Sequence, residues 1–356
     1  MSRTLLIMAG GTGGHIFPAM AVAEYLSVRG WHIVWLGTRR GMESRLVPSR
    51  GYTMAWVRMS GLRRSGLLRA ALLPLNLLIA FGQSARAIFR HRPDVVLGMG
   101  GYVTFPGGMM ASLLNRPLVI HEQNSIAGLA NRVLARLADR VLAAFPRAFG
   151  ARVDVLWVGN PVREDIAALD PPEMRMHDRS GRLQVLVIGG SLGAQALNET
   201  VPQAIARMAA GERPRVTHQS GESHIDALRE HYAAAGVDAE LVPFIENMAA
   251  RYAAADLVIC RAGATTIAEI AAAGVASVLV PYPHAVDDHQ TANARHLSER
   301  GAALLVSQKE FTPERLAGLL AGLTREALMA MAVAARALAK PHATHEVAAV
   351  CTELAA

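Results

Sequence analysis

The chain repeats one local pattern half a chain apart. Near the N-terminus an apolar run leads into residues 8–15 (MAGGTGGH), and a second apolar run leads into residues 188–194 (IGGSLGA). In both places a predicted strand breaks into a glycine turn before a helical pattern, which puts backbone N–H groups at a helix N-terminus, where anions and polar ligands bind. Two such units predict two similar α/β domains that face each other across a cleft. This layout suits the joining of two substrates, at least one of them phosphorylated.

Apolar segments alternate with longer helical patterns along the whole chain. This alternation is typical of parallel sheets with helical crossovers, so we expect a doubly wound sheet in each half, with ligands beyond the carboxyl ends of the strands. We predict strands in the first half at residues 4–9, 32–36, 94–97, 118–121, 140–143 and 153–158, and in the second half at 184–188, 215–218, 239–242, 257–260, 277–280 and 303–305.

The domain boundaries follow from length and from turn-forming residues. A chain of 356 residues favours two domains. The stretch 159–163 (GNPVR) follows the sixth predicted strand and marks the junction, so we assign 1–160 to the first domain and 161–340 to the second. Pro341 should break the alanine-rich helical end of the second domain. We expect residues 341–356 to form a helix that packs back on the first domain.

Cysteine content and charge limit the classes of function. Cys260 and Cys351 lack a CxxC pattern or a Cys/His cluster, which argues against thiol chemistry, a disulfide framework and structural zinc. Without a recognisable secretory leader or an apolar run of about 18 residues, the chain is expected to be soluble or peripheral. Residues 1–160 hold 19 Arg against 6 Asp or Glu, whereas residues 161–356 hold 17 Arg or Lys against 23 Asp or Glu. The basic half should meet nucleic acid or an anionic membrane.

Two polar clusters in the first half could carry chemistry. The first glycine loop alone would suggest a dinucleotide site, but the end of the second predicted strand (GTRR, residues 37–40) lacks the acidic ribose ligand that such a site needs. His15 follows the loop and could act as a base or could cap and pack the helix. Residues 121–124 (HEQN) end an apolar strand, where they form either a site rim or a hydrogen-bonded loop.

Two further clusters lie in the second half. In residues 261–269 (RAGATTIAE), Gly263 permits a tight turn, and we expect Thr265 or Thr266 to cap the next helix. Glu269 either caps this helix or accepts two ribose hydroxyls, since a carboxylate suits a cis-diol. Residues 281–293 are rich in groups that bind hydroxyls. Their His and Asp residues could also bind a metal, but no Asp-x-Asp triplet accompanies them, so we predict no metal site.

Residues 63–81 are unusually apolar and begin with arginines. Part of this stretch could be a buried helix. Alternatively, its leucines enter a lipid surface while the arginines bind headgroups. The basic first half favours the membrane, and the aromatic content of 5% argues against nucleic acid, which is often bound by exposed aromatic rings.

Taken together, the motifs resemble those of the family 28 glycosyltransferases of peptidoglycan synthesis. The matching stretches occur in family order at residues 9–15, 98–102, 121–124, 159–163, 189–194, 261–265 and 289–293. The resemblance implies a GT-B fold of two Rossmann-like domains. It implies that GlcNAc moves from UDP-GlcNAc to the C4 hydroxyl of MurNAc in lipid I, giving lipid II and UDP with inversion at the anomeric carbon. It implies no cofactor and no bound metal.

The resemblance also assigns residues. Glu269 would bind the ribose, Gln290 with His289 would read the sugar hydroxyls, and Ile245 would meet the uracil through its backbone. The whole set implied for UDP-GlcNAc is Thr12, Gly13, Gly14, Asn124, Arg163, Ser191, Ile245, Ala264, Thr265, Thr266, Ile267, Ala268, Glu269, His289 and Gln290. The set implied for the acceptor side is Gly11, Tyr102 and His121. The set expected at the membrane is Arg63, Arg64, Arg69, Leu72, Leu75, Leu78, Ile79 and Phe81.

The expected reaction is a direct displacement in which a base deprotonates the acceptor hydroxyl. We take His15 as that base, with Glu122 as its orienting partner or as the rival base. The expected location is the cytoplasmic face of the inner membrane, with anionic phospholipid and cell-wall synthesis or division proteins as candidate partners. Three rival interpretations stay open: another GT-B glycosyltransferase acting on a lipid acceptor, a non-catalytic UDP-sugar-binding protein, and a UDP-GlcNAc epimerase.

Overall fold

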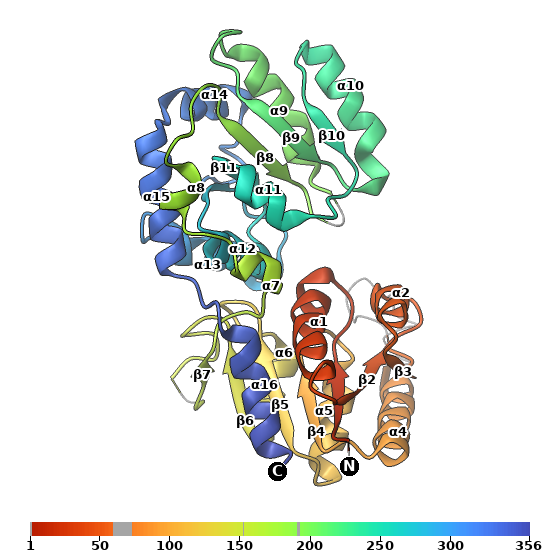
Figure 1. Cartoon of the computed structure of the whole chain (residues 1–356). Coiled ribbons are helices and arrows are strands. Elements are labelled where there is room, and N and C mark those ends of the chain that lie inside the picture. The colour runs from red at the N-terminus through yellow and green to blue at the C-terminus, as the bar shows by residue number, and fades with distance from the viewer. Residues whose placement is uncertain (1, 60–72, 152, 191–192) are drawn as a thin grey trace. The chain divides into compact units, whose positions relative to one another are not determined.

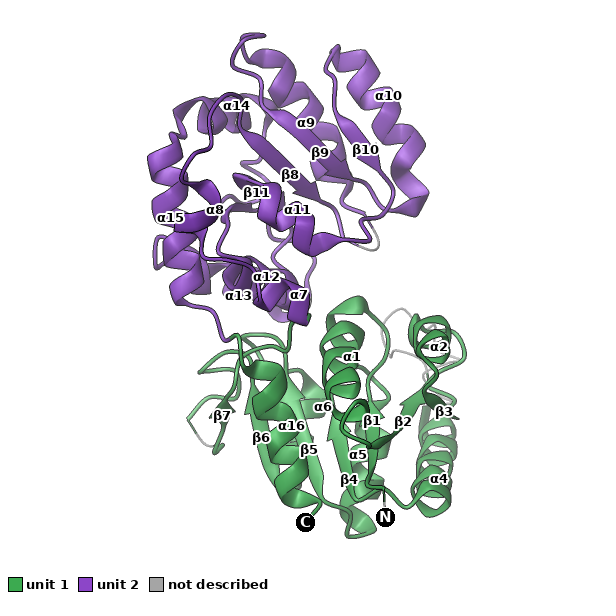
Figure 2. Cartoon of the chain, viewed as in Figure 1, with its two compact units in different colours: residues 1–163, 341–356 green, residues 164–340 purple. Residues whose placement is uncertain are grey.

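The computed structural model describes residues 2–59, 73–151, 153–190 and 193–356. The chain divides into two compact units, shown in separate colours in Figure 2. Unit 1 comprises residues 1–163 and 341–356, and unit 2 comprises residues 164–340. The division between the units falls three residues after the junction expected from the sequence, and the C-terminal helix belongs to unit 1.

Unit 1 is built on a seven-stranded parallel sheet with the order β3-β2-β1-β4-β5-β6-β7 (Figure 1). Its strands are β1 (Thr4–Met8), β2 (His32–Gly37), β3 (Thr53–Trp56), β4 (Val95–Gly98), β5 (Leu118–Glu122), β6 (Arg140–Ala143) and β7 (Leu156–Trp157). Its helices are α1 (Gly13–Ser27), α2 (Glu43–Leu46), the 3-10 turn η1 (Pro48–Arg50), α4 (Leu73–His91), α5 (Thr104–Leu113), α6 (Leu129–Leu134) and α16 (Ala343–Leu354).

Alternate residues of the central strands of unit 1 pack on opposite faces of the sheet. Leu5 and Ile7 of β1 pack in one core with α1 and α16. Leu6 and Met8 pack in a second core with α4, α5 and α6. Strands buried on both faces read as continuous apolar runs, which is why these segments could be found from the sequence. The polar residues that follow such strands lie at the carboxyl edge of the sheet.

Unit 2 repeats the arrangement with six parallel strands in the order β10-β9-β8-β11-β12-β13. Its strands are β8 (Gln184–Ile188), β9 (Arg215–Gln219), β10 (Glu240–Val242), β11 (Leu257–Cys260), β12 (Ala276–Leu279) and β13 (Leu304–Leu305). Its helices are α7 (Glu164–Ala167), α8 (Pro172–Met176), α9 (Gln195–Arg207), η2 (Glu222–His224), α10 (Ile225–Ala235), α11 (Met248–Ala254), α12 (Ala264–Ala273), η3 (Val286–Asp288), α13 (His289–Ser298), α14 (Pro313–Gly322) and α15 (Arg325–Ala337). The first six strands of both units therefore have one order, and the predicted fold class is confirmed.

A carboxylate ties the first strand of each unit to the fourth strand. In unit 1, Asp94 accepts the N–H of Thr4 at 2.6 Å. In unit 2, Asp256 accepts the N–H of Gln184 at 2.8 Å. Each aspartate directly precedes the fourth strand of its sheet, β4 or β11. The duplication therefore extends to a side-chain contact at the amino edge of both sheets.

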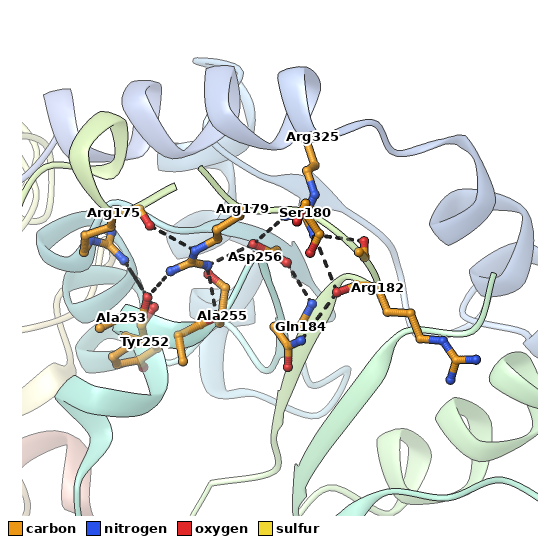
Figure 3. A network of polar contacts seen from close by, with 12 residues as sticks. Arg175, Arg179, Ser180, Arg182, Gln184, Tyr252, Ala253, Ala255, Asp256 and Arg325 are labelled. Atoms are coloured by element: carbon orange, nitrogen blue, oxygen red, sulfur yellow. Dashed lines mark hydrogen bonds and ion pairs between the residues drawn. The ribbon is translucent and has the colours of Figure 1, made fainter. Parts of the chain in front are cut away.

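Asp256 is also the centre of a buried ion-pair network (Figure 3). Its carboxylate is fully buried and lies 2.9 Å from Arg179 Nη1 and 3.1 Å from Arg325 Nη1. Arg175 and Arg179 also donate to backbone carbonyls at the end of α11. A buried carboxylate needs such partners because its transfer out of water is costly. The network fixes α11, which carries a side chain of the candidate site.

One strand was missed from the sequence. The edge strand β3 is four residues long and half exposed. Its apolar run covers only residues 54–57 (MAWV), and its side chains are partly exposed at the edge of the sheet. In addition, the last predicted strand of the first half, 153–158, is reduced to the two residues of β7.

Candidate active site

The first glycine loop joins β1 to α1 and lies over a buried carboxylate. Gly11 has a positive φ of 93°, and its N–H donates to Glu43 Oε2 at 3.2 Å. Glu43 Oε1 accepts the N–H and the hydroxyl of Thr38, at 2.9 and 2.8 Å. Glu43, the acid near the end of β2 in these contacts, is therefore fully buried, and its oxygens accept hydrogen bonds from Gly11 and Thr38. It shapes the loop from below and does not serve a ligand ribose.

The helix α1 starts directly after this loop, with Thr12 as its N-cap residue. The carbonyl of Thr12 accepts the N–H of His15 at 3.1 Å, while its exposed hydroxyl makes no capping bond. A Cβ on Gly13 would lie 2.8 Å from the ring of Phe17. A side chain at this position would therefore displace the exposed ring of Phe17, and the Thr12 hydroxyl is not used as a helix cap.

A second loop of unit 1, residues 98–102 (GMGGY), follows β4 and packs against the first loop. Gly100 and Gly101 have positive φ values of 93° and 83°. A Cβ on Gly101 would lie 2.3 Å from a carbonyl oxygen of the first loop, and a Cβ on Gly100 would lie 2.4 Å from His15 Nδ1. Gly101 thus lets the two loops approach closely, and Gly100 makes room for the His15 ring. Tyr102 also lies against the first glycine loop.

The polar residues at the end of β5 meet α1 through Gln123. His121, Glu122 and Gln123 are buried, with exposed fractions of 0%, 3% and 1%. The Oε1 atom of Gln123 lies 2.9 Å from Nδ1 of the half-buried His15. This contact between Gln123 and His15 was not predicted.

Glu122 makes hydrogen bonds with the loop that follows β5 and with α6. Its Oε1 accepts the backbone N–H and the side-chain amide of Asn124, at 2.9 and 3.2 Å. Its Oε2 accepts the N–H of Gly128 at 3.1 Å and the side-chain amide of Asn131 at 2.8 Å. Four donors therefore occupy the carboxylate and hold the loop that leads into α6. In this geometry Gln123, rather than Glu122, contacts the ring of His15.

In unit 2 the second glycine loop joins β8 to α9. The N–H of Gly190 donates to Gln219 Oε1 at 3.1 Å. A Cβ on Gly193, which has a φ of 74°, would lie 2.4 Å from the carbonyl oxygen of Ser220. This loop is therefore fitted closely to the end of β9. The predicted phosphate ligand Ser191 lies outside the described residues. Arg163, predicted beside it, is half-buried and is the last residue of the main segment of unit 1.

The helix α12 carries six of the fifteen predicted donor residues. Its N-cap residue is Gly263, without a side-chain capping bond, so the capping role expected for Thr265 or Thr266 is wrong. Both threonines are instead half-buried in the first turn of the helix. Ala264 and Ile267 are buried in the unit core, and Ala268 is half-buried. Backbone N–H groups of the first turn have no acceptor within their own helix, which suits an anionic ligand.

Glu269 stands in the second turn of α12, close to α11. The buried Tyr252 of α11 donates its hydroxyl to Glu269 Oε2 at 3.0 Å. This bond fixes one oxygen of the carboxylate, so Glu269 is a held side chain rather than the helix cap that the sequence also allowed. Tyr252 was not found from the sequence, because a tyrosine in an alanine-rich helix reads as a core residue.

The start of α13 presents Gln290. The N–H of Tyr282 donates to Gln290 Oε1 at 2.9 Å, which leaves the amide NH₂ group as the donor toward a ligand. His289, the residue before it, is half-buried. Ile245 lies in the loop between β10 and α11 with a buried side chain, so any ligand contact from it would come through its backbone.

The described residues offer no metal site or reactive thiol. Among them, no group of three or more His, Cys, Asp or Glu side chains lies close enough to hold a metal ion. The thiols of Cys260 and Cys351 are buried and unpaired. Burial raises the pKa of both thiols, that of Cys351 to about 12.

The predicted membrane residues fall into three groups. Leu75, Leu78 and Ile79 are exposed on α4, with fractions of 55%, 68% and 38%. Phe81, by contrast, is half-buried and packs against Phe105, with ring centroids 6.0 Å apart. Arg63, Arg64, Arg69 and Leu72 lie outside the described residues. Within the described part of the chain, no single helix is long and apolar enough to span a membrane, although the pair α14 and α15, bent by 96°, passes the same test of length and composition.

Comparison with known proteins identifies the family. The model of the glycosyltransferase family 28 N-terminal domain matches residues 5–143, and that of the family 28 C-terminal domain matches residues 184–348. The chain belongs to glycosyltransferase family 28. A relative from Nitrosospira multiformis is 60% identical over 100% of both chains, and one from Cupriavidus necator is 63% identical over 99% of this chain and 98% of its own. Both are named UDP-N-acetylglucosamine–N-acetylmuramyl-(pentapeptide) pyrophosphoryl-undecaprenol N-acetylglucosamine transferase.

Solved structures agree with the family 28 assignment. The crystal structure of Acinetobacter baumannii MurG has a TM-score of 0.84 and 41% identity, covering 99% of both chains. The glycosyltransferase of kitacinnamycin has a TM-score of 0.70 at 18% identity, covering 97% of this chain and 98% of its own, and shares the fold alone. The GT-B fold expected from the motifs is therefore confirmed.

Proposed function

We propose that this family 28 enzyme transfers GlcNAc from UDP-GlcNAc to the C4 hydroxyl of MurNAc in lipid I. The products are lipid II and UDP. The observation that carries this function is the full-length likeness to transferases of that name, at 60–64% identity over 98–100% of each chain. A likeness that covers both domains supports the donor specificity and the acceptor specificity together.

UDP-GlcNAc binds to unit 2 in this proposal, with its diphosphate at the N-terminus of α12 and its ribose on Glu269. The partial positive charge of a helix N-terminus suits a diphosphate. The Tyr252 hydroxyl supports the ribose role because it holds Glu269 in one orientation, and a carboxylate can accept both hydroxyls of a cis-diol. Gln290 supports sugar recognition because its oxygen is already bound by a backbone N–H.

In the reaction, His15 takes the proton of the acceptor C4 hydroxyl while the oxygen attacks C1 of GlcNAc. The bond between C1 and the diphosphate oxygen breaks, and its electron pair leaves with UDP. Attack from the opposite side inverts the anomeric carbon and gives a β(1→4) linkage. The α12 N-terminus and Arg163 stabilise the charge that grows on the diphosphate, so no metal ion is required.

The decisive experiment follows label from radiolabelled UDP-GlcNAc into the lipid fraction, with a lipid I analogue and excess EDTA. UDP-GalNAc serves as the control donor. We expect transfer that requires the lipid acceptor, persists in EDTA and fails with UDP-GalNAc. A His15→Ala variant should lose about 10²–10⁴-fold in turnover, the usual contribution of a general base. Donor binding without transfer would favour a UDP-sugar-binding protein or an epimerase, and the absence of donor binding would refute the donor site.

We also propose that unit 1 contacts anionic phospholipid at the cytoplasmic face of the inner membrane, where lipid I is embedded. The exposed Leu75 and Leu78 of α4 support this contact, as does the excess of arginine in residues 1–160. Arg63, Arg64, Arg69 and Leu72 belong to the same proposed surface. Cell-wall synthesis or division proteins stay candidate partners, without residues assigned to them.

Vesicle flotation tests the membrane contact. Wild-type protein should float with phosphatidylglycerol vesicles and much less with phosphatidylcholine vesicles. Leu78→Glu should weaken the binding about tenfold or more, since burial of a leucine is worth about 1.5–3 kcal/mol. Val28→Glu is the matched control, because Val28 is 81% exposed beyond the end of α1. Equal losses in both variants, or none in Leu78→Glu, would refute the contact.

A further inference from the structure

Three hydrogen bonds connect a backbone carbonyl to the ring of His15. His121 Nε2 lies 2.8 Å from the carbonyl oxygen of Gly159. His121 Nδ1 lies 3.0 Å from Gln123 Nε2, and Gln123 Oε1 lies 2.9 Å from His15 Nδ1. All four residues belong to unit 1. Because His121 and Gln123 are buried, water does not compete for the hydrogen bonds of these two side chains.

The first bond fixes the direction of the next. A carbonyl oxygen can only accept, so Nε2 of His121 carries a proton. Burial lowers the pKa of His121 to about 4, so the ring is neutral near pH 7 and its Nδ1 is an acceptor. Gln123 must therefore turn its NH₂ group toward His121. A second bond, from Gln123 Nε2 to the His121 carbonyl oxygen at 3.2 Å, fits the same orientation.

The last bond then sets the protonation of His15. With its NH₂ group on His121, Gln123 points its Oε1 atom at His15 Nδ1, and an amide oxygen can only accept. His15 Nδ1 must therefore carry the proton in this bond. The second ring nitrogen of neutral His15, Nε2, keeps its lone pair.

We propose that Gln123 is a positioning residue that holds His15 in the Nδ1–H tautomer, so that Nε2 is the atom that takes the acceptor proton. The inference deepens the proposed function, because it rests on His15 as the general base. Gln123 acts through the imidazole ring. Within residues 121–124, His121 and Gln123 then fix the tautomer of His15, and Glu122 holds the loop before α6.

An amide at this position fixes the ring without adding charge. Gln123 Oε1 accepts from Nδ1–H both before and after His15 takes a second proton. The amide does not carry that proton onward, and His121 already has its Nε2 proton on Gly159. The proton removed from the acceptor hydroxyl therefore stays on His15 and leaves through Nε2 after the transfer.

The tautomer can be measured directly in the wild-type protein. We would label the histidines with ¹⁵N and read the chemical shifts of the His15 ring nitrogens at alkaline pH, assigning them by their loss in His15→Gln. Nδ1 should show the shift of a protonated nitrogen and Nε2 that of an unprotonated one. Protonation on Nε2 instead would overturn the proposal without any need for a variant.

Variants connect the tautomer to catalysis. Gln123→Met keeps the length of the side chain but removes its polar atoms, so His15 should move toward the Nε2–H form that imidazole prefers in water. The kcat should fall about 10- to 100-fold, with the KM for UDP-GlcNAc changed less than about twofold. An unchanged tautomer in this variant would refute the role of Gln123. An altered tautomer with unchanged kcat would refute the assignment of Nε2 as the proton acceptor.

Two controls separate this proposal from its alternatives. Glu122→Gln should perturb the loop before α6 but leave the His15 tautomer unchanged, whereas an orienting Glu122 would make the tautomer change. Gln203→Met, on the exposed surface of α9, repeats the substitution outside the site and should leave tautomer and kcat unchanged. If wild-type protein transfers no GlcNAc, the proposed function fails, while the wild-type spectrum still decides whether Gln123 sets the tautomer.

Discussion

Replacement of Gly100 by alanine should displace His15, the proposed base, while leaving the proposed donor site intact. The added Cβ would lie 2.4 Å from His15 Nδ1, 2.7 Å from Cε1 of the same ring and 3.0 Å from Gln123 Oε1. It would therefore enter the contact between the ring and its orienting amide. We expect a large loss of kcat and an unchanged affinity for UDP-GlcNAc, because the residues proposed for the ribose and sugar, Glu269 and Gln290, lie in unit 2.

The size of the loss follows from the distances. A carbon and a ring nitrogen that are not bonded settle at about 3.5 Å, so the His15 ring must move by about 1 Å. A displacement of about 1 Å from the reactive geometry can cost about 10²-fold in rate, which corresponds to about 2.7 kcal/mol of activation free energy. An alanine at the positive φ of Gly100 also strains the backbone, which should destabilise the folded state by about 1–3 kcal/mol.

Gly51→Ala separates the two effects. Gly51 also has a positive φ, 78° against 93° for Gly100, but a Cβ there would meet nothing within 4 Å. The assay is steady-state release of UDP with a lipid I analogue, together with calorimetric titration of UDP. Gly100→Ala should lose about 10²-fold in kcat and bind UDP within twofold of wild type, while Gly51→Ala keeps its activity. The reasoning fails if Gly100→Ala retains half of the wild-type turnover, or if Gly51→Ala loses as much.

Three further predictions concern binding and stability. Tyr252→Phe should raise the KM for UDP-GlcNAc about tenfold at constant kcat, because Glu269 loses a hydrogen bond to its charged oxygen; an unchanged KM would contradict the ribose assignment. Asp256→Ala should lower the free energy of unfolding by about 3–5 kcal/mol in urea titrations, since it leaves two arginines without their buried partner. A loss below about 1 kcal/mol would contradict a stabilising role for this ion-pair network. Burial lowers the pKa values of His121 and His218 to about 4 and about 3. Below about pH 6.5 the unfolded chain therefore binds more protons than the folded chain. Each histidine should lower the free energy of unfolding by up to about 1.4 kcal/mol per pH unit as the pH falls toward 4. A urea midpoint that stays constant from pH 7 to pH 5 would refute this.

The fold could be predicted where burial leaves a local signature. Strands covered on both faces must be apolar throughout, and the repeated glycine turns mark the first strand of each sheet, so both sheets could be found. The edge strand β3 was missed although residues 54–57 (MAWV) are apolar, because so short a run does not by itself distinguish a strand from a helical segment. The cap of α12 was misassigned for a different reason. Thr265 and Thr266 are both good capping residues, but the helix begins earlier, with Gly263 as its N-cap, so the threonines lie inside its first turn.

Glu43 shows a second limit of local patterns. The expected position for an acidic ribose ligand after β2 holds none, which by the usual rule argues against a dinucleotide site. An acid nevertheless reaches this edge of the sheet from α2 and accepts the Gly11 N–H. Since that N–H points into the protein, the first glycine loop cannot present the full set of amides that a diphosphate receives from such loops. The sequence does not reveal that the Gly11 N–H is already bound, because this depends on the position of α2 beneath the loop.

The alternation of side chains along a strand could have identified Gln123, rather than Glu122, as the residue that contacts His15. Side chains along a strand point to opposite faces in turn. Val119 of β5 packs in the core with α1, and Ile120 packs in the core with α6. Continued along β5, the same alternation places His121 and Gln123 on the α1 side, where His15 lies, and Glu122 on the α6 side, where it meets Asn131. A carboxylate beside a histidine is the more familiar catalytic pair, but the strand geometry places the amide of Gln123, and not the carboxylate of Glu122, beside His15.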